Sequence, residues 1–501
     1  MKKLTAIILA IALVALAGCA GTGAKDAAAK DSLIIAIDKD ITTLHPSDYA
    51  STNENILSEQ VYDTLMYLPE SGHDFEPRLA ETWEVSEDGL SYTFHLRQGI
   101  KFHDGSPFTA EDVKFSAELY SNSSYQGAVV DGLSSVEVLD EHTVVLHTAN
   151  VFSPFLENIA TMRIGSKAYH DSASAEDFAN KPIGCGPYEF VSHELGSTIT
   201  LKAYEDYYRG APSIKNVTFR ILADDATIAV SLKTKEIDFV KISETNLANL
   251  ENTEGIKIME VPESRFGFIS LNHEKEPFSD VRFRQAVAYA IDRQNLLDLA
   301  MDGIGTVNSN IISPLRFGYS DDQPKYGYDP EYAKSILADM GITTPYDLGI
   351  MHVAEQYSTQ AQVIQNDLAA IGLEVKIEVV EFNTLLQNMF NGDIGITTMS
   401  MVLEGTTQQY AMALTSDYVG MANNVRYSNP EIDQLFKDAE LAIDEDERFE
   451  IYNTIFTKVQ EEAVFIVLYN TICLYAYNDQ LNVPQLPLEG DFYIYDFQWN
   501  Q

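Results

Sequence analysis

Arg163 is the side chain whose surroundings point most directly to chemistry. It is the one charged residue in the mostly apolar run 159–164. A guanidinium binds a carboxylate through two parallel hydrogen bonds, so an arginine in such a run is suited to an anionic partner. We expect Arg163 to be buried or to face a cleft, where it holds either a structural counter-ion or an acidic group of a ligand.

No motif in the sequence gives comparable support for a catalytic site. The sequence contains no GxSxG, HExxH or GxxxxGK[ST] motif and no EF-hand calcium loop. His103 and Asp104 are adjacent, but neighbouring residues on a turn usually cap the backbone. We therefore expect a binding protein that is not an enzyme and that has no cofactor and no metal site.

Bulk composition narrows the class of partner. The 501 residues carry a formal net charge of −42 and are 45% hydrophobic. Such an acidic surface argues against nucleic acid and against anionic lipid headgroups. The length and apolar content are sufficient for two lobes with separate cores, and we expect a monomer.

The N-terminus indicates export and lipid anchoring. Lys2 and Lys3 precede an apolar stretch, 6–17, that is too short for a membrane span. The following Leu-Ala-Gly-Cys order resembles the bacterial lipobox, in which Cys19 is lipidated. We expect a signal peptide at 1–18 and a lipidated Cys19 with a flexible tether at 19–31, so that the membrane contact is through the lipid anchor only. An ordinary signal peptide with an incidental cysteine is the alternative.

Two cysteines remain in the exported chain. Cys185 and Cys473 lie far apart and lack CxxC spacing, so we expect no zinc site. Either both are buried thiols, or they form one long-range disulfide, which an oxidising compartment permits.

Periodicity predicts the elements that position these residues. Residues 79–115 read as strand, turn, strand, turn and helix, and 348–401 alternate strand and helix as in a small α/β lobe. A helix is expected over 55–65 and a last strand over 493–499. Three arginines after residue 280 are expected to form ion pairs on helix surfaces: Arg282, Arg284 and Arg293.

Three segments carry a family resemblance. Residues 79–115, LAETWEVSEDGLSYTFHLRQGIKFHDGSPFTAEDVKF, resemble the diagnostic segment of the family-5 extracellular solute-binding proteins. Residues 181–188, KPIGCGPY, and the block 271–293 are similar to two further motifs of that family. These proteins are receptors that deliver oligopeptides, dipeptides or nickel and metal chelates to ABC importers.

The resemblance implies an α/β, two-lobed periplasmic-binding-protein fold of type II (cluster C), with a discontinuous first lobe and a hinge. Lobe I is expected at 32–268 with an extra subdomain, lobe II at 269–475, and a return to lobe I at 476–501. Two chain crossings, near 265–272 and 469–477, would form the hinge. The implied partners are a small solute, an ABC permease and its ATPase.

The resemblance also implies contacts with the solute. Peptide receptors of the family hold the ligand's ammonium with an aspartate after a tryptophan, where this chain has Glu404 and Met401. They hold the carboxylate with an arginine in the loop that here contains Glu355. Nickel-type receptors place an arginine near Arg163. The loop with Tyr49 and Thr52 closes over the ligand in this family.

Three functions therefore remain open. Capture of a peptide or a similar small solute is the main hypothesis, and binding of nickel or another metal chelate is the alternative. An extracytoplasmic hydrolase or a sensory lipoprotein is a further alternative. All three place the protein outside the cytoplasm.

Overall fold

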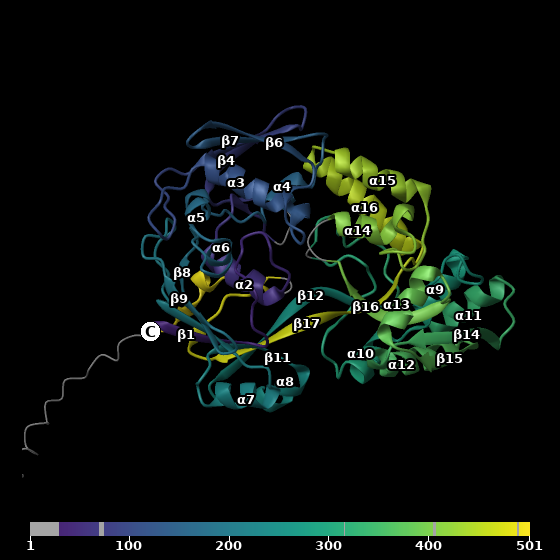
Figure 1. Ribbon diagram of the computed structural model, residues 1–501. Helices are drawn as coiled ribbons and strands as arrows, with labels where there is room; N and C mark the ends of the chain where they lie inside the picture. Colours follow the sequence, from purple (N-terminus) through teal and green to yellow (C-terminus); the bar gives the residue numbers. More distant parts are fainter. Residues whose placement is uncertain (1–29, 70–74, 315, 404–406, 488–489, 501) are drawn as a thin grey trace, which may run out of the picture.

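The computed structural model describes residues 30–69, 75–314, 316–403, 407–487 and 490–500. Figure 1 shows two lobes joined by a pair of strands that pass from one lobe into the other. These strands are β12 (Ile256–Leu271) and β17 (Ile466–Asn478), which pair antiparallel along most of their length. They coincide with the two crossings that the sequence predicts.

An eleven-stranded sheet is therefore continuous through both lobes. In lobe I, β17 pairs antiparallel with β11 (Phe239–Ile242), and in lobe II, β12 pairs antiparallel with β16 (Ile396–Val402). The other strands are β1 (Ser32–Ile37), β10 (Asn216–Ile221), β9 (Thr198–Ala203) and β8 (Tyr188–Glu194) in lobe I, and β14 (Tyr346–Val353), β15 (Leu373–Val379) and β13 (Thr306–Val307) in lobe II.

Lobe I is completed by helices on this sheet and by a subdomain. The subdomain has a four-stranded sheet in the order β4 (Ala80–Val85), β5 (Ser91–Leu96), β7 (Thr143–Thr148) and β6 (Leu133–Asp140). Its helices are α3 (Ala110–Ser121), α4 (Phe155–Ile159), α5 (Lys167–Ser172) and α6 (Ala175–Asn180). The helices on the main sheet are α2 (Thr52–Val61), α7 (Asp225–Lys233) and α8 (Glu244–Leu250).

The predicted order of elements over 79–115 is confirmed. Tyr92, Phe94 and Leu96 are buried, because alternate residues of β5 face the subdomain core. Thr109 caps α3, and its N–H donates to the Asp112 carboxylate at 2.9 Å. This capping box satisfies donors that the first turn of a helix leaves free.

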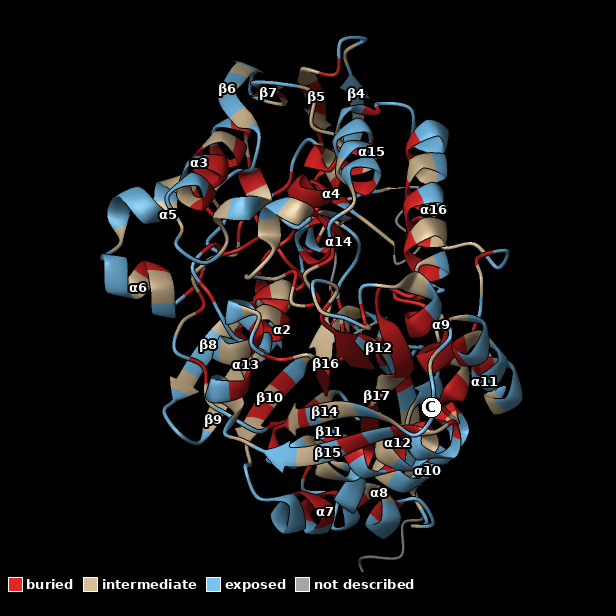
Figure 2. Cartoon of the chain, turned by 90° about the vertical axis from the view of Figure 1, so that its right-hand side faces the viewer, coloured by how far each residue is buried: buried red, intermediate tan, exposed pale blue. Residues whose placement is uncertain are grey.

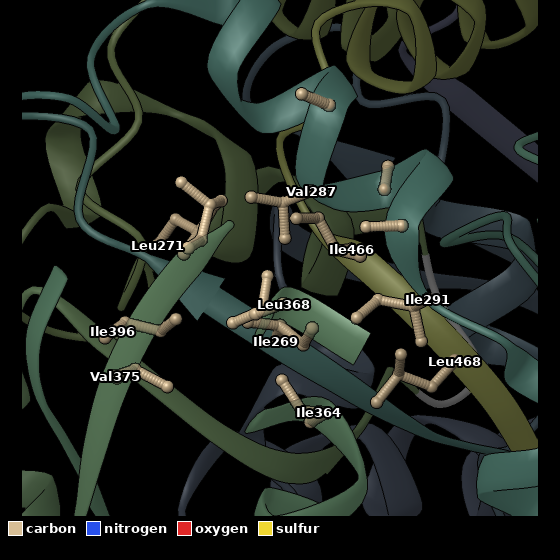
Figure 3. Close-up of a cluster of buried hydrophobic side chains, with 14 of the residues drawn as sticks. Ile269, Leu271, Val287, Ile291, Ile364, Leu368, Val375, Ile396, Ile466 and Leu468 are labelled. Carbon is tan, nitrogen blue, oxygen red and sulfur yellow. The ribbon is translucent and has the colours of Figure 1, made fainter. Parts of the chain in front are cut away.

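In lobe II, helices pack around three short strands. The helices are α9 (Val281–Ala290), α10 (Arg293–Ala300), α11 (Pro330–Asp339), α12 (Ser358–Ala370), α13 (Phe382–Asn391), α14 (Thr407–Leu414), α15 (Pro430–Leu441) and α16 (Glu445–Glu461). Figure 3 shows aliphatic side chains from α9 and α12, from β16 and β15 and from both crossing strands meeting in one core. The crossing strands are thus part of the lobe II core, with Ile269 and Ile466 buried in it.

Two sequence predictions are wrong. The expected last strand over 493–499 is a 3-10 helix, Ile494–Asp496, followed by a two-residue strand, β19 (Gln498–Trp499). Ile494 and Phe497, which do not alternate, are the residues of this segment that are buried in the lobe I core. Arg284 and Arg293 are buried and donate to backbone carbonyls, including those of Glu462 and Val467. Only Arg282 forms the expected surface ion pair, with Asp280 at 2.7 Å.

Candidate functional site

The predicted solute contacts fall into two groups, one on each lobe. Tyr49, Thr52 and Arg163 belong to lobe I around α2, whereas Met401 and Glu355 belong to lobe II. Glu404 lies outside the described residues. Figure 1 shows α2 on one side of the crossing strands and β16 on the other. The candidate contacts therefore come from both lobes.

Arg163 is buried, with 4% of its surface exposed. Its Nη2 donates to the side-chain oxygen of Asn55 at 2.6 Å and to the Asn55 carbonyl at 3.2 Å, and lies 3.6 Å from Glu59 Oε1. The ring of Tyr49 covers the guanidinium at 4.5 Å. Nη1 is buried and has no hydrogen-bond partner in the structure. Arg163 thus holds a structural counter-ion and retains one unused donor.

Two carboxylates beside Arg163 were not found from the sequence. The Asn55 amide donates to Asp491 at 3.2 Å and to Glu59 at 3.4 Å, so it bridges both. Burial and the nearby Asp491 raise the pKa of Glu59, against the opposing effect of Arg163. Asp491 is 436 residues from Asn55, and no local pattern in the sequence signals such a contact.

The helix that presents these groups is fixed at its first turn. Glu54 accepts hydrogen bonds from the Thr42 hydroxyl at 2.6 Å and from the N–H groups of Thr42, Ala50 and Ser51 at 2.9–3.0 Å. Burial alone raises the pKa of Glu54, but these donors lower it to about 2. Tyr49 is buried and Thr52 is exposed, so of these two residues only Thr52 is accessible to a solute in this structure.

The lobe II group surrounds the end of β16. Met401 is partly buried against a lobe II core and pairs with Phe266 of β12. Glu355 is exposed in a 3-10 turn, Glu355–Tyr357, whose Tyr357 hydroxyl lies 3.0 Å from the Ser400 hydroxyl. This contact holds the turn that carries Glu355 beside β16.

The crossing strands carry a polar cluster where their register shifts, over 262–266. The Glu263 carboxylate accepts hydrogen bonds from Thr471 Oγ1 and Cys473 Sγ, both at 2.6 Å. Lys241 Nζ lies 3.3 Å from the same carboxylate. Burial raises the pKa of Glu263, but these partners bring it below its usual value. The cluster ties β11, β12 and β17 together at the point where a hinge would bend.

The remaining candidates have structural roles. Cys185 and Cys473 are buried thiols, which confirms the first of the two predicted states. The His103 ring bonds to Gly186 O, and burial lowers its pKa to about 4, so it is neutral at physiological pH. Asp104 caps the N–H of Ser106 at 2.9 Å, as expected for a turn.

The described residues contain neither a metal site nor a helix that could span a membrane. No group of three or more His, Cys, Asp or Glu side chains among them is placed to hold a metal ion. No helix among them is both long and apolar enough to cross a membrane.

Comparison with known proteins decides the family. Residues 74–422 match the profile of the "Bacterial extracellular solute-binding proteins, family 5 Middle". This protein belongs to that family. Its members are substrate-binding proteins outside the cytoplasm, so the receptor class expected from 79–115 is confirmed.

Individual relatives are similar over nearly their full length. Heme-binding protein A of Haemophilus influenzae is 29% identical, covering 84% of this chain and 83% of the relative. The dipeptide-binding protein of Escherichia coli is 28% identical, covering 94% of each chain. The solved structure of HbpA2 from Haemophilus parasuis is 25% identical, with a TM-score of 0.84, and the match covers 94% of this chain and 100% of that one. The type II periplasmic-binding-protein fold is therefore confirmed.

Proposed function

We propose that this protein is the lipid-anchored receptor of an ABC importer and that it captures peptides by hinge closure. The observation that carries the proposal is the placement of candidate contacts on both lobes of a family-5 fold joined by two strands. A ligand that touches both lobes only in the closed state shifts the equilibrium toward that state. The dipeptide-binding relative supports peptide as the cargo.

Several finer points belong to the same proposal. Residues 1–18 are removed, Cys19 carries the lipid, and the mature protein is a monomer without enzymatic activity. The proposed lobe boundaries are 32–268, 269–475 and 476–501. A crossing within β12 is supported by Val261 in a lobe I cluster and Ile269 in a lobe II cluster, and a crossing within β17 by Ile466 and Cys473 in the same two lobes. The permease and its ATPase supply the energy for transport.

Small-angle scattering tests peptide capture. The radius of gyration of the protein should fall when a mixed pool of peptides of two to ten residues is added. An equal concentration of the matching free amino acids serves as the control. If scattering is the same with and without every peptide length, peptide is not the cargo.

A carboxylate-bearing metal chelate is the second candidate. The buried Nη1 of Arg163, which has no hydrogen-bond partner, favours it, because an unsatisfied buried donor is costly and an anionic ligand would satisfy it. The heme-binding relative supports this class. The test is native mass spectrometry of the protein purified from its host.

The chelate reading predicts a metal-bearing adduct that is lost in Arg163→Met and kept in Arg282→Met. The second variant makes the same substitution at an exposed arginine of lobe II. An adduct of unchanged occupancy in folded Arg163→Met would remove Arg163 from the site, and a bound peptide would favour the first proposal.

A further inference from the structure

A second contact joins the two lobes, away from the crossing strands. The N–H of Ser153 donates to the Glu440 carbonyl at 2.8 Å, and its hydroxyl donates to the Ala439 carbonyl at 2.7 Å. Ser153 precedes α4 of the subdomain, whereas both carbonyls lie in the last turn of α15. The last carbonyls of a helix have no partner within the helix, so Ser153 caps a helix of the other lobe.

A pair of buried charges lies beside this cap. Arg448 Nη2 of α16 is 3.8 Å from Glu157 Oε1 of α4, and their side chains are only 11% and 9% exposed. The Arg448 guanidinium also stands over the Phe317 ring of lobe II at 5.2 Å. Because water is largely excluded from the pair, removing Arg448 would leave the Glu157 charge poorly solvated while the lobes stay engaged.

An apolar contact completes the interface. Ile443, in the connection between α15 and α16, lies against the β4–β5 turn of the subdomain. A Cβ added at Gly89 would come within 2.7 Å of the Ile443 side chain and 3.4 Å of Val151. The connection therefore fits closely on the subdomain backbone. We name the five residues Ser153, Glu157, Ala439, Glu440 and Arg448 the rim contact.

The rim contact lies apart from the crossing strands. Figures 1 and 2 both show α15 beside α4 in the upper part of the molecule, and β12 with β17 below them, at about mid-height. A rotation about the crossing strands that separates the lobes must break the rim contact, because its hydrogen bonds have little reach. The buried residues on the two sides also belong to different apolar clusters, so no shared core resists separation there.

We propose that the rim contact is a latch that holds the two lobes together in the absence of any ligand. It is made entirely of residues of the chain itself and requires no solute. A latch of this kind raises the population of the engaged state before binding. The apparent affinity for a solute that binds the engaged state then rises with that population.

Hydrogen exchange on the ligand-free protein tests the latch directly. The amide of Ser153 is a donor in the contact, so peptides covering 149–158 should exchange slowly in the unmodified protein. Ser153→Ala and Arg448→Met should each raise deuterium uptake in 149–158 and 436–446, with a larger radius of gyration. Ser153→Thr keeps the hydroxyl and should restore protection. Arg282→Met is the matched control for Arg448→Met.

This experiment tests the latch separately from the proposed capture of peptides, because no ligand is present. Uptake in 149–158 that already matches an unstructured peptide in the unmodified protein would overturn the latch. Uptake and radius that stay unchanged in Ser153→Ala, with melting curves confirming a folded protein, would also overturn it. Faster exchange in both segments together supports it, since the two segments meet only across the lobes.

Discussion

The partners of one buried arginine, Arg163, determine whether it can bind an anionic solute. Arg163 is held by the uncharged Asn55 and lies 3.6 Å from Glu59. Burial and Asp491 raise the pKa of Glu59, which favours its neutral form and leaves the guanidinium charge only partly compensated within lobe I. The composition of the run 159–164 predicts the burial of Arg163, and the structure confirms it. Its counter-ion could not be predicted, because Glu59 is 104 residues away in sequence.

Glu54 gives a pH-dependent prediction at the same scale. Its pKa of about 2 in the folded protein lies below the usual value of 4.5, so its ionised form stabilises the fold above pH 4.5. That stabilisation is lost as pH falls from 4.5 through 2. We expect Glu54→Gln to lower the free energy of unfolding by about 2–3 kcal/mol at pH 7, because the amide nitrogen replaces an oxygen that accepts two of the four hydrogen bonds and the negative charge is lost.

Urea unfolding at pH 7 and at pH 2.5 checks this expectation. The difference between Glu54→Gln and the unmodified protein should shrink at the lower pH. Glu381→Gln is the control, because Glu381 also caps a helix but is exposed. An equal difference at both pH values would contradict the role assigned to the ionised carboxylate.

At the scale of elements, the structure explains why the motif 181–188 contains glycines. From the sequence alone, this motif was matched only by its resemblance to the family. Gly186 N–H donates to the Val61 carbonyl at 2.9 Å, at the end of α2. A Cβ at Gly184 would overlap the same carbonyl. The motif therefore packs directly on α2, the helix that presents Asn55 and Glu59.

Gly184→Ala should consequently be severe. Backbone atoms of Val61 cannot move aside as a flexible side chain would, so we expect a loss of about 3 kcal/mol in the free energy of unfolding. Gly327→Ala is the matched control, since a Cβ there has no atom within 4 Å. Thermal and urea unfolding measure both. A Gly184→Ala protein as stable as Gly327→Ala would show that this close approach is absent in solution.

Sequence patterns located many elements, and the exceptions share a cause. The helix expected over 55–65 is α2, Thr52–Val61, which begins earlier because Ser51 and Glu54 form a capping box. The chain crossing expected near 265–272 is the last part of β12, which begins at Ile256. Local periodicity detects a face that packs on a single core. It does not detect a strand that leaves one core for another, nor contacts such as Asn55 to Asp491 that join distant segments.

At the scale of the whole molecule, we expect a lipid on Cys19 to anchor the protein to the membrane. Cys19 lies outside the described residues, so the prediction rests on the sequence of the leader. Cys19→Ser should move the protein from the membrane fraction to the soluble fraction of its host. Cys185→Ser, at a buried thiol of the folded body, should leave it in the membrane fraction. Equal membrane association of both variants would rule out this anchor.

The continuous sheet has a consequence for how the molecule can be divided. Every boundary between the lobes passes through β12 or β17, so a cut there would end a strand within a core and expose the unpaired edge of its neighbour. Neither lobe should therefore fold as a separately produced fragment. New chain ends are better placed in an exposed turn such as that of Leu195 and Gly196 between β8 and β9, which leaves both crossing strands intact.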